Sequence, residues 1–158
     1  MSLDPVFPSE FESDEEPLVA FFSEDISFSL PNEETVISWI EQVVIREECE
    51  LIGLQIVFCS DPYLLDMNVA HLNHDFFTDI ITFPYQRPPG IEGDLFISID
   101  RVKDNAIQLQ QSFERELHRV IIHGVLHLCG HNDKSDEDAA AMRLLEDAAL
   151  LLHPAFSE

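Results

Sequence analysis

The sequence predicts a single α+β domain in which about four strands form a mixed sheet covered by helices. Three observations indicate this fold class. The chain has 158 residues, a length that suits one domain built around one core. Short apolar segments rich in β-branched residues alternate with longer segments in which apolar residues recur every three or four positions. Strands and helices interleaved in this way are typical of a sheet covered by helices.

The first half of the chain is expected to supply two strands and two helices. Residues 26–30 alternate apolar and polar side chains, which predicts the first strand. Asn32 is a plausible N-cap for the helix that follows, because two glutamates next to it favour the positive end of a helix. Residues 51–59 are nearly all apolar and predict an interior strand, and a short helix over about 61–71 comes next.

The second half is expected to supply two strands and three helices. Residues 79–84 and 93–99 read as strands, joined by the loop 85–92, which is rich in Pro and Gly. Ser135 and Asp138 form a capping box at the start of the last helix. The three helices are expected at roughly 100–111, 113–129 and 136–152. The middle one has little polar surface, so we expect it at the centre of the domain.

Two histidines and an aspartate have the spacing of three ligands for one metal ion. His123 and His127 are four residues apart, so on a helix they point the same way, one turn apart. Gly130 can end that helix in a left-handed conformation, which lets the chain fold back and bring Asp133 to the ion. Three protein ligands leave a tetrahedral ion one position for water or substrate, which is typical of a catalytic site.

Other roles for these residues stay open. The two histidines can be ordinary hydrogen-bonded helix residues, and Asp133 can cap the helix at 136–152 while Asp136 takes its place as ligand. His131 is expected to face the cleft or solvent. Cys129 points away from the helix face that carries His127, so we do not expect it to bind zinc.

The metal chemistry favoured by these ligands is hydrolysis. An ion held by neutral imidazoles and a carboxylate lowers the pKa of its bound water to roughly 7, so metal-bound water is the expected nucleophile. Proteases with a similar ligand spacing need a glutamate directly after the first histidine, and that position is Gly124 here. We therefore do not expect a protease. Gly124 would also allow a bulky group or another backbone to approach the metal closely.

Composition restricts the partners and the compartment. Acidic residues outnumber basic ones by 31 to 8, which gives a formal charge of −23 and repels polyanions at long range. Residues 1–20 read as an acidic, poorly ordered segment, and 21–158 as the hydrolase domain. No apolar run approaches the ~18 residues of a membrane span, and no secretory signal is evident. Three cysteines without CxxC pairing suit buried thiols in the cytoplasm.

Three blocks of this sequence resemble the YbeY-type rRNA maturation factors, which are single-strand endoribonucleases of bacteria. The family motif HGxLHLxGYDH is matched by HGVLHLCGHND at residues 123–133. The family's TDVLSFP corresponds to TDIITFP at 78–84, and its GDIxIS to GDLFIS at 93–98. The resemblance covers roughly residues 26–152.

This chain departs from the family pattern at positions that matter for the site. The family's third ligand is usually His, and Asp133 stands there instead. An aspartate adds negative charge, which should make the ion a poorer Lewis acid and shift preference toward harder ions. The family's Tyr is replaced by His131, and a family arginine that is thought to meet phosphate corresponds to Leu72. Arg87 or Arg119 would have to replace that cation.

Asp79 and Arg119 are candidate catalytic residues, each with an alternative role. Asp79 can orient a ligand histidine through its second ring nitrogen, or it can cap the start of a strand. Arg119 precedes His123 by one turn and can line the same face, or it can form a surface ion pair with Glu116 or Glu114. The residues do not identify a general base.

The resemblance implies metal-dependent cleavage of single-stranded ribosomal RNA during rRNA maturation and quality control of the small ribosomal subunit. We expect a cytoplasmic zinc-dependent endoribonuclease with one Zn²⁺ per chain, and nickel or another divalent ion remains possible. The alternative is a ribosome-assembly factor in which the metal is structural. The high negative charge argues against unaided RNA binding, so the metal or a ribosomal partner would have to position the substrate.

Overall fold

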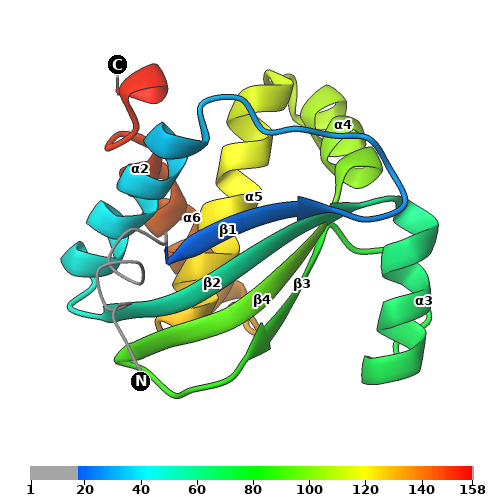
Figure 1. Cartoon of the computed structure of the whole chain (residues 1–158), viewed down its shortest axis with the longest axis horizontal. Coiled ribbons are helices and arrows are strands. Elements are labelled where there is room, and N and C mark those ends of the chain that lie inside the picture. Colours follow the sequence, from blue (N-terminus) through cyan, green and yellow to red (C-terminus); the bar gives the residue numbers. More distant parts are fainter. Residues whose placement is uncertain (1–17, 158) are drawn as a thin grey trace, which may run out of the picture.

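The computed structural model describes residues 18–157, in which a four-stranded sheet carries helices on both of its faces (Figure 1). The elements in chain order are β1 (Val19–Ser23), α2 (Glu33–Arg46), β2 (Glu50–Cys59), α3 (Asp61–Leu72), β3 (Ile80–Pro84), β4 (Gly90–Ser98), α4 (Ile99–Leu109), α5 (Phe113–Leu128), α6 (Asp136–Leu150) and a 3-10 turn (Pro154–Phe156). The strand order is β1-β2-β4-β3. The first three strands are parallel and β3 is antiparallel to β4, so the predicted α+β fold with a mixed four-stranded sheet is confirmed.

The position of the first strand was predicted wrongly. β1 lies at Val19–Ser23, where its backbone pairs with residues 54–58 of β2, and residues 26–30 are not in a strand. The alternation in 26–30 does describe burial, because Ile26, Phe28 and Leu30 pack against the core. A strand also needs a backbone partner, and β1 already occupies that edge of the sheet.

Domain limits and element ends also differ from the expectation. Val19 and Ala20 belong to β1, so the folded domain includes part of the segment assigned to residues 1–20, and residues 1–17 lie outside the described part. β4 begins at Gly90, which shortens the predicted loop 85–92. Predicted helices 100–111, 113–129 and 136–152 are confirmed as α4, α5 and α6 with ends shifted by one or two residues.

Serine side chains cap four of the helices. Ser60, Ser98, Ser112 and Ser135 each accept a hydrogen bond from the backbone N–H three residues later. Asn32 does precede α2, but in a left-handed conformation with φ 59°, and its side chain makes no capping bond within the described residues. The start of α2 therefore depends on its acidic first turn rather than on a side-chain cap.

Helices α2, α4, α5 and α6 bury one face of the sheet, and α5 crosses it at the centre (yellow in Figure 1). Side chains of β2 and β4 such as Leu54 and Leu95 meet Val120, Ile121 and Val125 of α5 in one continuous core. The expectation that this helix is central is confirmed. Helix α3 packs against the opposite face in a smaller cluster with β3 and β4. No helix within residues 18–157 is long and apolar enough to cross a membrane.

Replacing Gly93 by Ala should destabilise the fold. A methyl group at position 93 would lie 2.6 Å from the backbone carbonyl oxygen of Phe83 and 3.2 Å from Leu128, so β3 or α5 would have to shift. We expect a loss of about 1–3 kcal/mol in the free energy of unfolding, measured by urea denaturation. Gly53→Ala is the matched control, because no atom lies within 4 Å of that methyl position. Equal stability of the two variants would contradict the close approach of β3 to β4 at Gly93.

His153 should make the fold less stable as the pH falls. Burial, together with the neighbouring His118, lowers the pKa of His153 from 6.5 to about 4. Between pH 6.5 and pH 4 the unfolded chain binds a proton at His153 that the folded chain does not bind. The free energy of unfolding is therefore unaffected by this group above about pH 6.5 and decreases as the pH falls toward 4. His153→Asn keeps an acceptor for the N–H of Ala155, which is 3.0 Å from Nδ1 of His153, and removes the titration.

Urea denaturation of metal-free protein at pH 7 and pH 5 tests this pH dependence. The wild type should lose about 1–2 kcal/mol more than His153→Asn over this interval. His71→Asn, on the exposed side of α3, should behave as the wild type does. An identical pH dependence of the wild type and His153→Asn would show that His153 is not responsible.

Candidate metal centre

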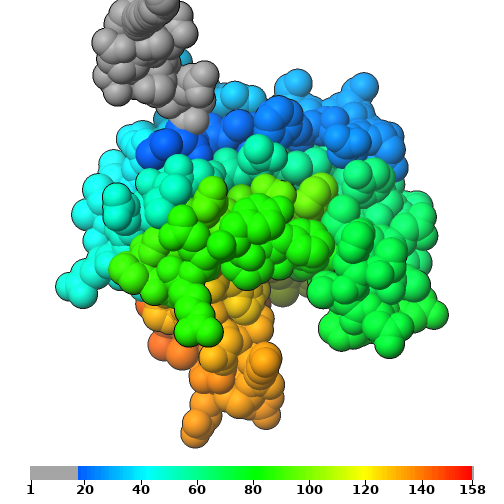
Figure 2. All heavy atoms as spheres, turned by 60° about the horizontal axis from the view of Figure 1, so that its bottom comes forward, coloured from blue at the N-terminus to red at the C-terminus, as the bar shows by residue number. Residues whose placement is uncertain are grey.

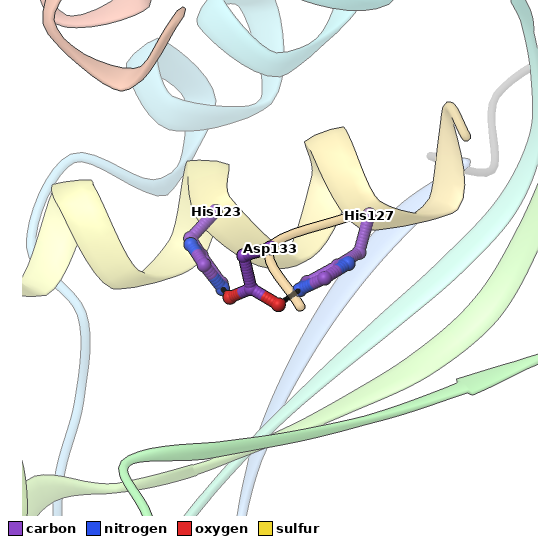
Figure 3. A group of neighbouring side chains, drawn as sticks. All are labelled: His123, His127 and Asp133. Carbon is purple, nitrogen blue, oxygen red and sulfur yellow. Dashed lines mark ion pairs between the residues drawn. The ribbon is translucent and has the colours of Figure 1, made fainter. Parts of the chain in front are cut away.

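His123, His127 and Asp133 come together at the end of α5 (Figure 3). Nε2 of His123 lies 3.3 Å from Oδ2 of Asp133, and Nε2 of His127 lies 3.5 Å from Oδ1. One donor atom from each of the three residues lies within 4.8 Å of the other two. The structure thus brings together the three residues that the sequence nominated as ligands.

The distances between the imidazole nitrogens and the carboxylate are close to those of a tetrahedral metal site. With metal–ligand bonds of about 2.0–2.2 Å, two ligand atoms of a tetrahedral zinc site lie roughly 3.3 Å apart. Nε2 of His123 lies 3.3 Å from one carboxylate oxygen of Asp133, and Nε2 of His127 lies 3.5 Å from the other oxygen, both close to this value. Two imidazole nitrogens and one carboxylate oxygen are also donors that zinc and related divalent ions accept.

Local backbone geometry explains how three residues close in sequence reach one point. His123 and His127 lie one turn apart on α5, and their ring centroids are 4.6 Å apart. Gly130 has φ 109°, a backbone conformation that L side chains rarely adopt, and the chain reverses there as expected. Asp133 follows in the turn before α6. Asp136, the alternative ligand, starts α6 and is not part of the group.

A buried carboxylate fixes the orientation and the tautomer of His123. Oε2 of Glu146, from α6, lies 2.5 Å from Nδ1 of His123, and the Glu146 side chain is only 2% exposed. A carboxylate can only accept, so Nδ1 carries the proton and donates it to Glu146. The lone pair of a neutral His123 ring is then on Nε2, the nitrogen that faces Asp133. Metal-binding histidines commonly have such an outer partner.

Arg119 keeps Glu146 ionised. Its guanidinium donates to Oε1 of Glu146 at 3.0 Å and to both oxygens of buried Glu116 at 2.9 and 2.5 Å. Burial alone would raise the pKa of Glu146, but the hydrogen bond from His123 and the charge of Arg119 lower it overall. Burial would likewise lower the pKa of Arg119, and its two carboxylate partners raise it. The predicted ion pair with Glu116 is confirmed, although it is buried rather than on the surface.

The second ligand histidine is also biased toward its neutral form. Burial and the neighbouring His123 lower the pKa of His127, although Asp133 acts in the opposite direction. A neutral imidazole is the form that binds a metal ion, so this environment suits a ligand.

Asp79 lies in the same cleft but does not orient a ligand histidine. Its Oδ2 accepts from Nδ2 of Asn105 at 3.1 Å and lies 3.9 Å from the Arg119 guanidinium. Burial raises the pKa of Asp79, although Arg119 and His123 partly oppose this effect. The orienting role that the sequence suggested for Asp79 is filled by Glu146.

Gly124 and His131 have roles other than those expected. A methyl group on Gly124 would lie 2.7 Å from Ile80 and 2.9 Å from Leu95, so this glycine lets α5 approach the sheet rather than exposing the metal. His131 does not face the cleft or solvent freely, because its Nε2 lies 2.6 Å from Oε1 of Glu47 near the end of α2. Cys129 is not part of the group of candidate ligands.

A cleft of about 610 Å³ opens beside the three ligands, between the end of α3, β3 and the turn after α5. In Figure 2 it is the hollow between the green surface of α3 and the orange projection of that turn. Lys134 is the only lysine or arginine among the described residues that line it. Leu72 lines the cleft, whereas Arg87 and Arg119, the suggested substitutes for the family arginine, do not.

Sequence reasoning missed three residues of this site. Glu146 could have been found as an acid at a buried position of α6, in line with Met142 and Ala149. Lys134 directly follows the third ligand, but its sequence neighbours do not show that it faces the cleft. Phe76 comes from the loop after α3 and gave no periodic signal.

Comparisons with known proteins identify similar chains over most of the length. The family profile described as Endoribonuclease YbeY matches residues 20–152. Curated proteins named Endoribonuclease YbeY are 48% identical in Cytophaga hutchinsonii, over 87% of this chain and 96% of that one, and 46% identical in Flavobacterium johnsoniae, over 83% and 94%. A solution structure of a Thermotoga maritima protein has a TM-score of 0.61 at 22% identity, covering 85% of this chain and 87% of that one, and supports the fold.

Replacing Glu146 by Gln should weaken metal binding without removing a ligand. The neutral amide lacks the negative charge that stabilises the proton on Nδ1 of His123. Losses of about 10–100-fold in metal affinity are typical when such an outer partner is changed. Isothermal titration of metal-free protein with Zn²⁺ at pH 7 measures the effect. Asp147→Asn, an exposed charge change at the next position of α6, is the control and should bind Zn²⁺ as the wild type does. Equal affinity of Glu146→Gln and wild type would rule out this role for Glu146.

Proposed function

This chain belongs to the YbeY endoribonuclease family, and we propose that it cleaves single-stranded ribosomal RNA during rRNA maturation with one zinc ion held by His123, His127 and Asp133. The observation that carries the proposal is the arrangement of Nε2 of both histidines around the Asp133 carboxylate, at 3.3 and 3.5 Å. The proton on Nδ1 of His123, held by Glu146, leaves the correct nitrogen free for the ion.

The open side of the ligand group supports a catalytic rather than a structural metal. Structural zinc sites have four protein ligands, whereas catalytic sites have three and keep one position for water or substrate. Three candidate ligands lie next to the cleft here. The alternative, an assembly factor with a structural metal, is not favoured, because the similar curated proteins are named as endoribonucleases.

The chain's own residues would perform the remaining steps. His123, His127 and Asp133 would hold the zinc ion, which would supply a nucleophile at neutral pH and Lewis-acid stabilisation of the phosphate. Lys134 can pair with a phosphate of the RNA, since it is the basic side chain of the cleft. Asp79 lines the cleft and has a raised pKa, so it is the carboxylate suited to exchange a proton there. Arg119 and Glu116 position Glu146, and through it His123.

The charge of the chain supports a requirement for a partner. With 31 acidic against 8 basic residues, the protein gains little from long-range attraction to RNA. We therefore assign the small ribosomal subunit the task of presenting the RNA strand, and the cytoplasm is the compartment in which it does so. Zinc is the preferred ion because of the two imidazoles, and Asp133 in place of a third histidine leaves harder divalent ions as competitors.

Replacing His127 by Ala should abolish RNA cleavage while the fold persists. Removing a ligand should reduce cleavage of a single-stranded RNA oligomer by more than the roughly 10–100-fold that is typical of an outer partner. Gel analysis of products at limiting Zn²⁺ measures the rate, and elemental analysis gives the metal content. His71→Ala, an exposed histidine on α3, should keep full activity.

The same variant distinguishes an endoribonuclease from an assembly factor with a structural metal. If the metal were structural, His127→Ala would lose its cooperative unfolding transition along with the metal. Full cleavage by a folded His127→Ala variant with no bound metal would refute the metal-dependent mechanism.

A further inference from the structure

We propose that Phe76, backed by His74, is a stacking platform for one nucleobase of the RNA strand in the metal cleft. This inference rests on the proposed function and specifies how the substrate is held. Both rings line the cleft that also contains His123, His127 and Asp133. A base stacked on Phe76 would therefore belong to the same RNA segment whose phosphate reaches the metal.

The two rings already have the geometry of a stack. The centroids of His74 and Phe76 are 5.1 Å apart and the ring planes differ by 19°. Phe76 nevertheless stays 55% exposed, so much of its ring surface is open to a ligand in the cleft. A planar, apolar and exposed ring inside a cleft matches the flat face of a nucleobase.

A buried asparagine holds the platform in place. Asn68 is 1% exposed, its backbone carbonyl accepts from the N–H of His74 at 3.1 Å, and its side-chain Nδ2 donates to the carbonyl of Phe76 at 2.9 Å. Asn73 ends α3 in a left-handed conformation with φ 58°, which turns the loop back toward Asn68. The rings are thus positioned before any ligand binds, which reduces the entropy lost on binding.

The charges of the cleft favour stacking over phosphate contacts. Among the described residues that line it, Lys134 is the only cation, while Asp79 and Asp133 are acidic and Leu72 is apolar. A strand bound mainly through its backbone would need several cations. Stacking on an aromatic ring is independent of charge and contributes about 5- to 150-fold in affinity per base. It also selects single strands, because the bases of a duplex already stack on each other.

The adjacent Phe77 provides a matched control. It is 52% exposed and follows Phe76 directly in the sequence, but it does not line the cleft. Its ring lies under the guanidinium of Arg101, whose Cζ is 5.1 Å from the ring centroid. Phe77→Ala thus removes an equally exposed ring from the same loop without touching the cleft.

Binding of a fluorescein-labelled single-stranded RNA 12-mer to full-length, metal-free protein tests the platform without cleavage. Fluorescence anisotropy should show a roughly 5- to 150-fold weaker affinity for Phe76→Ala, near-wild-type affinity for Phe76→Trp, and no change for Phe77→Ala. A 12-mer that lacks its bases should bind the wild type and Phe76→Ala equally. With Zn²⁺ present, Phe76→Ala should raise KM for RNA more than it lowers kcat.

Two results would overturn the platform. One is an affinity of Phe76→Ala equal to that of the wild type, and the other is an equal loss in Phe77→Ala, which would indicate a general effect on the loop. These failures are separate from failure of the proposed function. A wild type that cleaves RNA while Phe76→Ala cleaves it with unchanged KM contradicts only the platform. A wild type that does not cleave RNA contradicts the proposed function itself.

Discussion

The hydrogen bond between His123 and Glu146 is the interaction on which the rest of the centre depends. It selects the tautomer that leaves Nε2 free, and it ties the end of α5 to α6 at a buried position. Glu146 could not stay ionised there alone, because an unpaired buried carboxylate is costly. Arg119 compensates it and is itself compensated by Glu116. The buried charges of Glu116, Arg119 and Glu146 thus determine which nitrogen of His123 carries the proton.

The candidate site lies where α5 packs closely on the sheet and β3 pairs with β4. Gly124 removes the side chain that would separate α5 from Ile80 and Leu95, and Gly93 allows β3 to pair tightly with β4. Since β3 is the antiparallel edge strand, its start and the loop before it lie beside the end of α5. The two glycines allow the central helix and the edge strand to pack closely, and the cleft lies beside these two elements.

The composition of the chain and the composition of its cleft are consistent with each other. A protein with a formal charge of −23 attracts RNA poorly at a distance, and the cleft offers a single lysine. The cleft also contains a candidate metal centre, a carboxylate with a raised pKa and an aromatic pair. These groups act at short range, which suits an enzyme whose substrate strand is presented by a larger assembly. The shortage of cations in the cleft is thus consistent with the proposal that a ribosomal partner presents the RNA strand.

The sequence by itself predicted the fold class, the five α-helices of the described residues and the group of candidate ligands. The three ligands lie within eleven residues, so helix geometry and one glycine are enough to bring them together. Only the tertiary structure identified β1, because alternation in 26–30 fitted a strand equally well until a backbone partner was known. It alone also identified Glu146, Lys134 and Phe76, and showed that Arg119 pairs inward. Glu146 is 23 residues from His123, and contacts over such distances depend on how helices pack, which local patterns do not encode.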